Sequence, residues 1–260
     1  MSAGAWVALK RAARRAADGV ATLAIRGEND LNIVGPEALA ELTAAARSLH
    51  DDDGLRAVVV TGVGGRAFIG GADVRHMATL DAGSATAFIT ALHEAIAALG
   101  AIPVPVIARI DGYCLGAGLE VAAGCDLRLA AETAVFGMPE VMVGIPSVIE
   151  AALLPRLVGW GRTAELVYLG KRWGAAEALA YGLVERVVPA ADLDAALEDW
   201  LDALLAAGPR AIRLQKALMR EWQSLPLGPA IEAGIARFAE AYEGDEPKRM
   251  MQAFLTRKRP

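Results

Sequence analysis

The sequence predicts an α/β protein that ends in a purely helical region, and three observations support this. Short apolar runs rich in β-branched residues alternate with longer segments of helical periodicity over most of the chain. Glycine-rich turns follow several of the predicted strands. After Pro189 no strand pattern occurs, and the apolar spacing is helical to the end. Alternating strands and helices followed by helices alone are typical of an α/β core with an appended helical region.

The first half of the chain supplies two clear strands and two clear helices. The runs VATLAI at 20–25 and AVVVTG at 57–62 are short, apolar and rich in β-branched residues, as buried strands are. Residues 36–49 form a predicted helix with Pro36 in its first turn, where proline is tolerated. Residues 84–99 carry apolar residues at helical spacing and predict a second helix.

The second half of the core continues the alternation. The run PVIARI at 105–110 predicts a strand. Residues 111–125 predict a glycine turn that leads into a helix of small residues. The runs DLRLA at 126–130 and AVFGMPEVMVG at 134–144 predict two further short strands.

The C-terminal region is predicted to be helical throughout. We place the boundary so that residues 1–191 form the α/β core and residues 192–260 form a helical oligomerisation region. We expect breaks at Gly208-Pro209, Pro226 and Gly228-Pro229. The apolar positions of this region should bury surface between subunits, and they include Trp200, Trp222 and Phe238.

Composition narrows the class of protein. Hydrophobic residues make up 55% of the 260 residues, which is enough for a sizeable core. The net charge is −5 and no long basic stripe occurs, which argues against nucleic acid as the main partner. No apolar run reaches the roughly 18 residues that span a bilayer. We therefore expect a cytoplasmic protein without a nucleic-acid or membrane partner.

The cysteines and histidines suggest neither a disulfide nor a metal site. Cys114 and Cys125 lie in apolar segments, as reduced core cysteines do. His50, His76 and His93 form no close-spaced ligand pair with either cysteine. The N-terminal segment carries arginines and no acid before residue 18, as a transit peptide would, but we interpret it as a short N-terminal strand pair.

Three segments carry candidate chemistry, namely RAFIGGAD at 66–73, DGYCLGAGLE at 111–120 and FGMPE at 136–140. Glycine clusters after strands let a ligand approach the backbone closely and leave N–H groups free to donate. Two such clusters can place two N–H groups on one oxygen, which is the geometry needed when negative charge develops on a carbonyl.

Glu120 and Glu140 are lone acids in apolar segments. Burial raises the pKa of a carboxyl group, which suits general acid–base catalysis near neutral pH. Each acid also has an ordinary interpretation: Glu120 as a helix-dipole partner or solvated residue, and Glu140 as a water-facing acid on an edge strand. The combination of all three segments favours a functional site.

Together these segments resemble the enoyl-CoA hydratase/isomerase family, also called the crotonase family. The resemblance covers nearly the whole chain. It includes RGENDLNIVGPEAL at 26–39, AFIGGADVRHM at 67–77, the run at 105–146 and the ending GDEPKRMMQAFLTRKRP. It implies a crotonase-like core of repeated ββα units arranged as a spiral. It also implies trimers that usually pair into hexamers.

The resemblance assigns roles by position. Gly70 and Ala117 fall where the oxyanion-hole amides lie, and Glu120 and Glu140 fall on the two catalytic glutamates of hydratases. The residues expected to line the path of the pantetheine and adenine groups are Gly70, Gly71, Ala72 and Asp73. Phe254 and Lys258 resemble residues that reach a coenzyme A across a subunit contact.

The implied reaction adds water to a trans-2-enoyl-CoA and gives a 3-hydroxyacyl-CoA. Both amides bind the thioester oxygen, Glu120 deprotonates the water that attacks C3, and Glu140 delivers a proton to C2. No cofactor is expected, since coenzyme A is part of the substrate. A 3-enoyl-CoA to 2-enoyl-CoA isomerase, or other acyl-CoA enolate chemistry, is the alternative. Isomerases generally need one acid, so the presence of both glutamates favours hydration.

Residues 144–155 depart from the family pattern, in which hydratases usually carry a proline and a glycine-rich stretch ending in Thr-Gln-Arg. Here those glycines are absent and the stretch is one residue shorter. Ser147 stands about where a glycine amide would help to hold the water, so we count it as substrate-binding. The larger side chains should reshape the acyl pocket. Glu150 is an additional acid, which we interpret as a helix-surface residue.

Other classes of protein fit less of the sequence. The glycine run at 62–67 fits the G-x-G-x-x-A motif of nicotinamide dehydrogenases, with Asp81 in range of a ribose, but a lone match is weak. A serine hydrolase using Ser147 would need a histidine partner, and none follows His93. A non-catalytic, RNA-binding relative would not need both glutamates.

Overall fold

The computed structural model describes residues 6–10, 18–27 and 29–256. Its larger sheet is parallel except for β1, which pairs antiparallel with β2 and forms the expected N-terminal strand pair. The strand order is β1-β2-β3-β5-β7-β10, with bounds Val7–Lys10, Val20–Ile25, Ala57–Gly62, Val106–Ile110, Leu127–Ala131 and Arg186–Val188. The strands expected at 20–25 and 57–62 are confirmed with the same bounds.

A smaller sheet runs beside the larger one. Its order is β4-β6-β8-β9, with bounds Ala67–Ile69, Tyr113–Leu115, Val135–Gly137 and Arg172–Gly174. Consecutive strands alternate between the sheets: β3, β5 and β7 belong to the larger sheet, and β4, β6 and β8, which follow each of them, belong to the smaller one. Helices follow these strand pairs. The repeated ββα spiral that the sequence resemblance implied is therefore confirmed.

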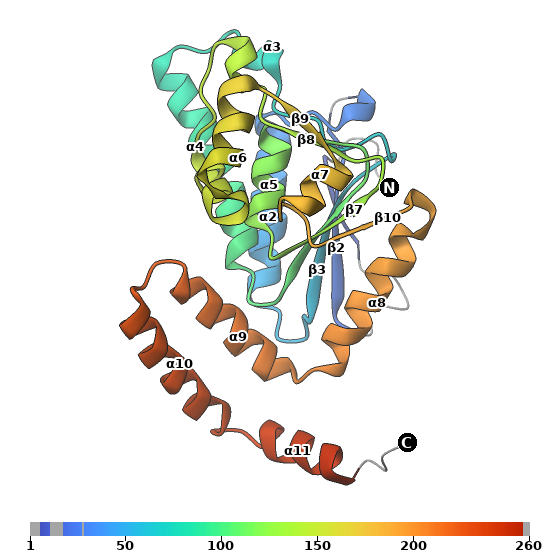
Figure 1. Cartoon of the computed structure of the whole chain (residues 1–260), viewed down its shortest axis with the longest axis vertical. Helices are drawn as coiled ribbons and strands as arrows, with labels where there is room; N and C mark the ends of the chain where they lie inside the picture. Colours follow the sequence, from blue (N-terminus) through green and yellow to red (C-terminus); the bar gives the residue numbers. More distant parts are fainter. Residues whose placement is uncertain (1–5, 11–17, 28, 257–260) are drawn as a thin grey trace.

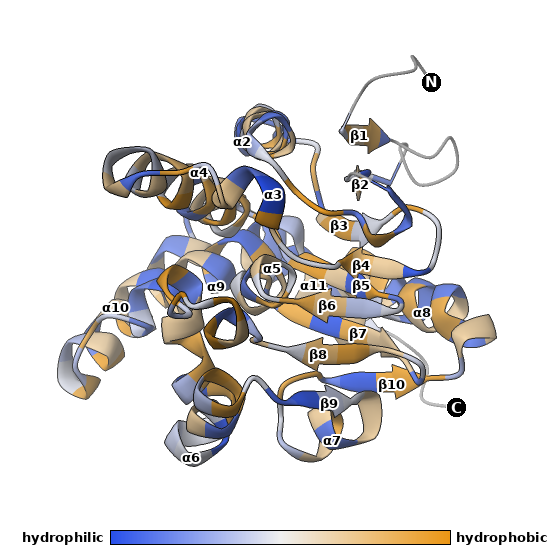
Figure 2. Ribbon diagram, turned by 90° about the horizontal axis from the view of Figure 1, so that it is seen from above, coloured by the Kyte–Doolittle hydropathy of each residue, from blue (hydrophilic) through white to orange (hydrophobic). Residues whose placement is uncertain are grey.

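Helices cover both faces of the larger sheet. The core helices are α2 (Pro36–His50), α3 (Val74–Met77), α4 (Ala82–Ala101), α5 (Ala117–Gly124), α6 (Leu154–Leu169) and α7 (Ala175–Ala180), with 3-10 turns η1 (Asn29–Leu31), η2 (Glu140–Val143), η3 (Ile149–Leu153) and η4 (Ala190–Asp192). On one face, Val58 and Val60 belong to the main core with α2, α4 and α5. On the other, Val59 packs in a second core with α8 (Leu193–Ala206). Figure 2 shows α8 on the opposite side of the strands from α2 and α4.

The remaining helices, α9 (Pro209–Trp222), α10 (Leu227–Ala241) and α11 (Glu246–Thr256), extend away from the sheets (Figure 1). The buried Lys216 ammonium ties α9 to the core by an ion pair with Asp126. The Glu246 carboxylate caps the start of α9, since it accepts the N–H groups of Arg210 at 3.1 Å and Ala211 at 2.9 Å. The ion pair therefore ties α9 to the core, and the Glu246 cap ties α11 to α9.

Three details differ from the sequence-based expectation. The strand expected at 134–144 ends at Gly137, because the chain turns into η2 after Pro139, a residue without an N–H for the sheet. Residues 113–115 form β6 rather than a turn. Pro229 does not break a helix, because it lies in the first turn of α10, where proline is tolerated.

One helix of the described residues, α4, has the length and composition of a membrane span. It packs against α2 and α5 along one side, through buried residues that include Phe88, Leu92 and Ile96, and much of its other side is exposed. We therefore interpret α4 as an amphipathic helix that packs on the core by one face.

Candidate active site

The turn between β6 and α5 presents a backbone donor. Gly116 adopts φ 52° and ψ −119°, a conformation that glycine reaches without a steric penalty. Its N–H donates to the Gly137 carbonyl at 2.9 Å. Ala117 is the first residue of α5, where a backbone N–H has no acceptor within the helix. No other acceptor for this N–H occurs in the described part of the chain, so it is available to a ligand oxygen.

Gly70 cannot supply the second donor in the way that the resemblance implied. Its N–H already donates to the Leu31 carbonyl at 2.8 Å. That hydrogen bond joins β4 to the η1 segment, and a single N–H proton cannot serve it and a ligand equally well. The assignment of Gly70 to the oxyanion hole is therefore wrong for this structure.

Ala72 is better placed to be the second donor. It forms a bridge with Val34, in which the Val34 N–H donates to the Gly71 carbonyl and the Asp73 N–H donates to the Val34 carbonyl, each at 3.0 Å. Groups on successive residues of an extended chain point to opposite sides. The Ala72 N–H therefore faces away from Val34, and it has no intramolecular acceptor among the described residues.

Both free amides border one cavity of about 800 Å³, a volume within the usual range for small-molecule sites. It is lined by the polar or small residues Gly70, Gly71, Ala72, Gly116, Ala117, Glu120 and Glu140, and by apolar residues that include Leu80, Phe88, Ile89, Leu92, Val143, Ile145 and Val148. The segments of the sequence with candidate chemistry thus meet at one cavity, although they lie in different ββα units.

Glu120 lies in the first turn of α5 and is only 5% exposed. Burial is the main cause that raises the pKa of its carboxyl group to about 8, and repulsion from the Glu140 carboxylate is the second. Its Oε1 accepts one long hydrogen bond, from the Ala151 N–H at 3.4 Å. That bond opposes the shift without cancelling it.

Glu140 opens η2 rather than lying on an edge strand. The Ser147 hydroxyl donates to Glu140 Oε2 at 2.7 Å. On the other side, a Cβ atom at Gly116 would lie only 2.4 Å from Glu140 Oε1, so this oxygen lies directly against the turn that carries the Ala117 amide. Ser147 therefore contacts the candidate catalytic carboxylate and fixes its orientation.

The remaining expected substrate contacts divide into two groups. Gly70, Gly71 and Ala72 line the cavity, whereas Asp73 and Ser147 do not. The Asp73 carboxylate instead caps α3 by accepting the Arg75 N–H at 2.9 Å. Phe254 on α11 is 77% exposed and does not line the cavity of its own chain, and Lys258 lies outside the described residues.

Sequence reasoning missed three polar residues of the cavity, Asp81, Thr86 and Arg172. Asp81 lines it and caps α4, accepting the Ser84 N–H at 2.8 Å. The aspartate and serine three positions apart before a helical pattern were a local signal for this cap. Arg172 lines the cavity from β9, which reaches the site by pairing antiparallel with β8. No local pattern marks such a residue, because its place depends on a non-local strand pair.

Glu150 is not the surface residue that we expected. Its side chain is 12% exposed, and His93 Nδ1 lies 2.7 Å from its Oε1. Its Oε2 is buried without a hydrogen-bond partner in the described structure. Glu150 also adds to the repulsion that raises the pKa of Glu120, after burial and Glu140. The Glu150 side chain therefore faces inward, and its charge acts on Glu120.

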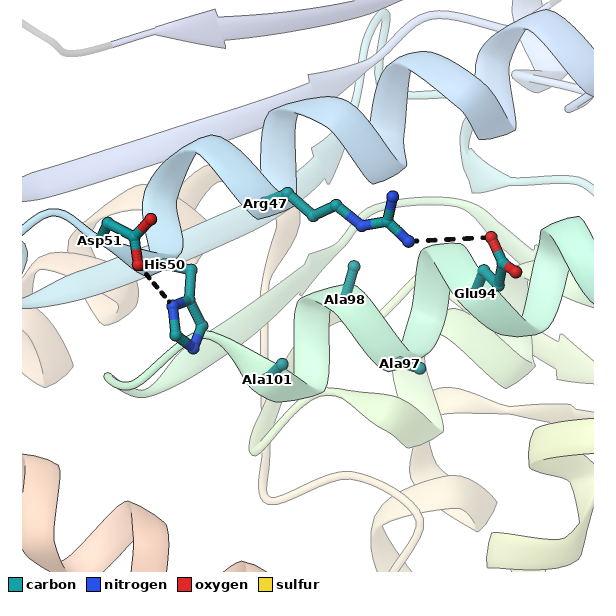
Figure 3. A pocket seen from close by; sticks show the side chains of 7 residues that line it. All are labelled: Arg47, His50, Asp51, Glu94, Ala97, Ala98 and Ala101. Carbon is teal, nitrogen blue, oxygen red and sulfur yellow. Dashed lines mark hydrogen bonds and ion pairs between the residues drawn. The ribbon is translucent and has the colours of Figure 1, made fainter.

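A second hollow between α2 and α4 has different chemistry (Figure 3). It is rimmed by an ion pair between Arg47 and Glu94 at 3.8 Å and by His50 against Asp51 at 2.9 Å. Its floor is formed by alanines of α4. None of the candidate site residues lines this hollow, so we place the candidate active site in the larger cavity.

The rival functions find little support in this geometry. The glycine run at 62–67 leads into strand β4 rather than a helix, so it lacks the helix N-terminus that binds a dinucleotide. Ser147 is bonded to Glu140, and His93 to Glu150, so no Ser–His pair forms there. Among the described residues, no cluster of three or more His, Cys, Asp or Glu side chains could hold a metal ion.

Comparison with known proteins leads to the same family as the sequence motifs. A family model described as enoyl-CoA hydratase/isomerase matches residues 15–260. A crotonyl-CoA hydratase of Syntrophomonas wolfei is 33% identical over 92% of this chain and 93% of its own length. A short-chain-enoyl-CoA hydratase of Clostridium acetobutylicum is 30% identical over 92% of each chain. The crystal structure of an enoyl-CoA hydratase from Mycobacterium smegmatis superposes with a TM-score of 0.92, at 28% identity over 98% of each chain.

Proposed function

The chain belongs to the enoyl-CoA hydratase/isomerase family, and from this premise we propose that it is a hydratase which adds water to a trans-2-enoyl-CoA. The observation that carries the proposal is the meeting of two carboxyl groups and two free amides at one cavity. Glu120 and Glu140 line it together with Ala72 and Ala117. Addition of water needs both a proton acceptor and a proton donor, which two carboxyl groups supply.

The proposed mechanism follows from these positions. The thioester oxygen accepts hydrogen bonds from the Ala72 and Ala117 amides, which stabilise the enolate as negative charge develops. Glu120 takes a proton from the water whose oxygen attacks C3. Glu140, oriented by Ser147, gives a proton to C2. The step begins with Glu120 ionised and Glu140 protonated. One proton enters Glu120 and one leaves Glu140, so the substrate gains one water and no electrons are transferred, and a return proton transfer from Glu120 to Glu140 through solvent restores the pair.

A panel of acyl-CoA substrates tests the proposal. The relatives named for crotonyl-CoA and short-chain enoyl-CoA support crotonyl-CoA as the first substrate. Hydration is followed by loss of the enoyl thioester absorbance, and isomerisation of a 3-enoyl-CoA by its gain. We expect hydration of crotonyl-CoA. A protein that isomerises 3-enoyl-CoA but adds no water would be an isomerase, and one that does neither would refute the proposed reaction.

The pH profile should report whether Glu120 is the base. Its pKa of about 8 leaves only a minor fraction of this group charged at pH 7 in the empty site. Because kcat/KM follows the ionisation of the free enzyme, we expect its rising limb to have a midpoint near pH 8, the pKa of the base. The measurement is kcat/KM for crotonyl-CoA from about pH 6 to pH 9. A decrease over the same interval would mean that Glu120 acts as the proton donor instead.

We further propose that the C-terminal helices mediate assembly into trimers or pairs of trimers. Ile231, Ile235 and Phe238 lie at helical spacing on α10 and are exposed in the single chain. Trp200, by contrast, packs in the second core of its own chain. In such an assembly, Phe254 and Lys258 would reach the coenzyme A bound to a neighbouring subunit.

Light scattering at micromolar concentration should show a trimer or hexamer. Phe238→Glu should shift the protein toward monomers, because it places a charge on the apolar face of α10. Glu232→Lys, an equally drastic change at another exposed position of α10, is the control and should leave the assembly intact. A wild-type protein that stays monomeric at this concentration would contradict the proposal.

A further inference from the structure

Glu150 is a largely buried acid, with a side chain 12% exposed, to which the proposed mechanism gives no role. It comes from η3, between α4 and α5, and both helices contact η3. His93, on α4, holds its Oε1 at 2.7 Å, while its Oε2 is buried and unpaired within the described structure. Burying a carboxylate oxygen without a donor is costly, so such a group calls for a physical explanation.

The backbone just before Glu150 is strained. Ile149 has φ 41°, in the left-handed region that a β-branched residue rarely adopts. An extended or right-handed conformation at Ile149 would send the following side chain in a different direction. Strain of this kind persists only where surrounding contacts enforce it, and it clusters at functional sites. The His93 contact to Glu150 is one contact that holds this turn.

The strained turn leads directly to Glu120. Ala151, the residue after Glu150, donates its N–H to Glu120 Oε1 at 3.4 Å. This is the one hydrogen bond to the Glu120 carboxyl within the described structure. The position of the Glu120 carboxyl group therefore depends on the turn that His93 and Glu150 hold in place. The negative charge that Glu150 places near this carboxyl group depends on the same turn.

We propose that Glu150, held by His93, is a positioning residue for Glu120. It acts in two ways: it anchors the turn that presents the Ala151 N–H to Glu120, and it places a second negative charge beside the Glu120 carboxyl. The inference that this serves a base rests on the proposed hydratase function. The physical coupling between Glu150 and Glu120 does not depend on that function.

Several titratable groups surround this pair. On α4 they are His93 and the exposed Glu94, which pairs with Arg47 instead. On α5 the group is Glu120 itself, and on η2 it is Glu140, which lies across the cavity. Removal of the Glu150 charge should therefore leave Glu140 as the main source of repulsion at Glu120.

The catalytic test compares matched variants in the pH profile of kcat/KM. Glu150→Gln keeps the size of the side chain and an acceptor for His93, but removes the charge. The rising limb of its pH profile should move to lower pH, since a like charge near Glu120 is lost. Glu94→Gln, the same change one residue from His93, should leave the midpoint at its wild-type pH.

The anchoring role has its own pair of variants. His93→Ala removes the donor to Glu150 and should lower kcat about tenfold with little change in KM, because general base catalysis is sensitive to the geometry of the base. His93→Asn offers its Nδ2 in place of Nδ1 and should retain most of kcat. Equal kcat values for His93→Ala and the wild type would overturn the anchoring role.

A substrate-free measurement keeps the proposal testable whatever the reaction is. A carboxyl whose pKa is raised on folding lowers the free energy of unfolding as pH rises from its unfolded value to its folded value, here from 4.5 to about 8. Comparison of the wild type with Glu120→Gln isolates this effect, and repeating the comparison in the Glu150→Gln background shows whether it ends at lower pH. We expect that it does.

The two proposals fail in different ways. A wild type without hydratase or isomerase activity would refute the proposed function, and the unfolding comparison would still decide the role of Glu150. An active wild type in which Glu150→Gln changes neither the pH midpoint nor the Glu120-linked stability would overturn the positioning role alone. A lower melting temperature as the sole effect of Glu150→Gln would likewise mean that the residue is only structural.

Discussion

Glu120→Gln and Glu140→Gln should each lower the hydration of crotonyl-CoA by roughly 10²–10⁴-fold, the usual contribution of a general acid or base. Glutamine preserves the size of each side chain but cannot take up or release the proton. Both side chains line the same cavity, and neither change removes an apolar contact. The measurement is kcat/KM and kcat for both single variants and for the double variant.

The double variant distinguishes a shared transition state from two separate effects. Because both carboxyls serve one addition of water, the double change should cost less than the product of the two single losses. Coenzyme A binding is the control and should survive, since the nucleotide would bind away from both carboxyls. An isomerase would respond unevenly: one glutamate would shuttle the proton, and the other would be nearly dispensable. Near-normal activity of Glu120→Gln would therefore refute the hydratase proposal.

Ala117→Pro should lower turnover by about 10²–10³-fold, the typical cost of losing one oxyanion-hole donor. The position suits this experiment. Ala117 is the first residue of α5, where proline is tolerated because the N–H makes no helical hydrogen bond. The substitution removes the donor, and the proline ring also occupies part of the space in front of it.

Ala117→Gly is the matched control, because it retains the N–H and changes only a methyl group. It should keep most of the activity while costing about 1 kcal/mol or less of stability. Melting temperatures of both variants establish that they are folded. A folded Ala117→Pro protein with full activity would show that this amide does not bind the thioester oxygen.

The sequence predicted those parts of the fold that depend on local pattern. The strands at 20–25 and 57–62 were placed correctly because their apolar residues are buried on both faces of the larger sheet. The helix at 36–49 was recognised from its period and its proline, and differs from α2 by one residue at its end. Such runs are specified by residues close together in the chain.

The parts that the sequence could not predict depend on contacts between distant residues. The Gly70 N–H is taken by Leu31, a residue far away in the chain, so its motif alone could not reveal that it is occupied. Glu150 points inward after Ile149, which adopts a left-handed conformation that a sequence gives no reason to expect of a β-branched residue. Both errors concern the direction of a group rather than the element that carries it.

The close contact at Gly116 has a consequence for sequence variation within relatives of this protein. Any side chain there would meet two obstacles, the positive φ and Glu140 Oε1 at 2.4 Å from the new Cβ atom. At Gly64, by comparison, the φ of 94° disfavours a side chain but no atom lies within 4 Å of one. Saturation mutagenesis under selection for activity should therefore give different results at the two positions. Gly64 should accept asparagine or aspartate, whereas Gly116 should accept no other residue. Because Glu140 lies so close to the turn that carries the Ala117 amide, we expect active variants to retain glycine at position 116.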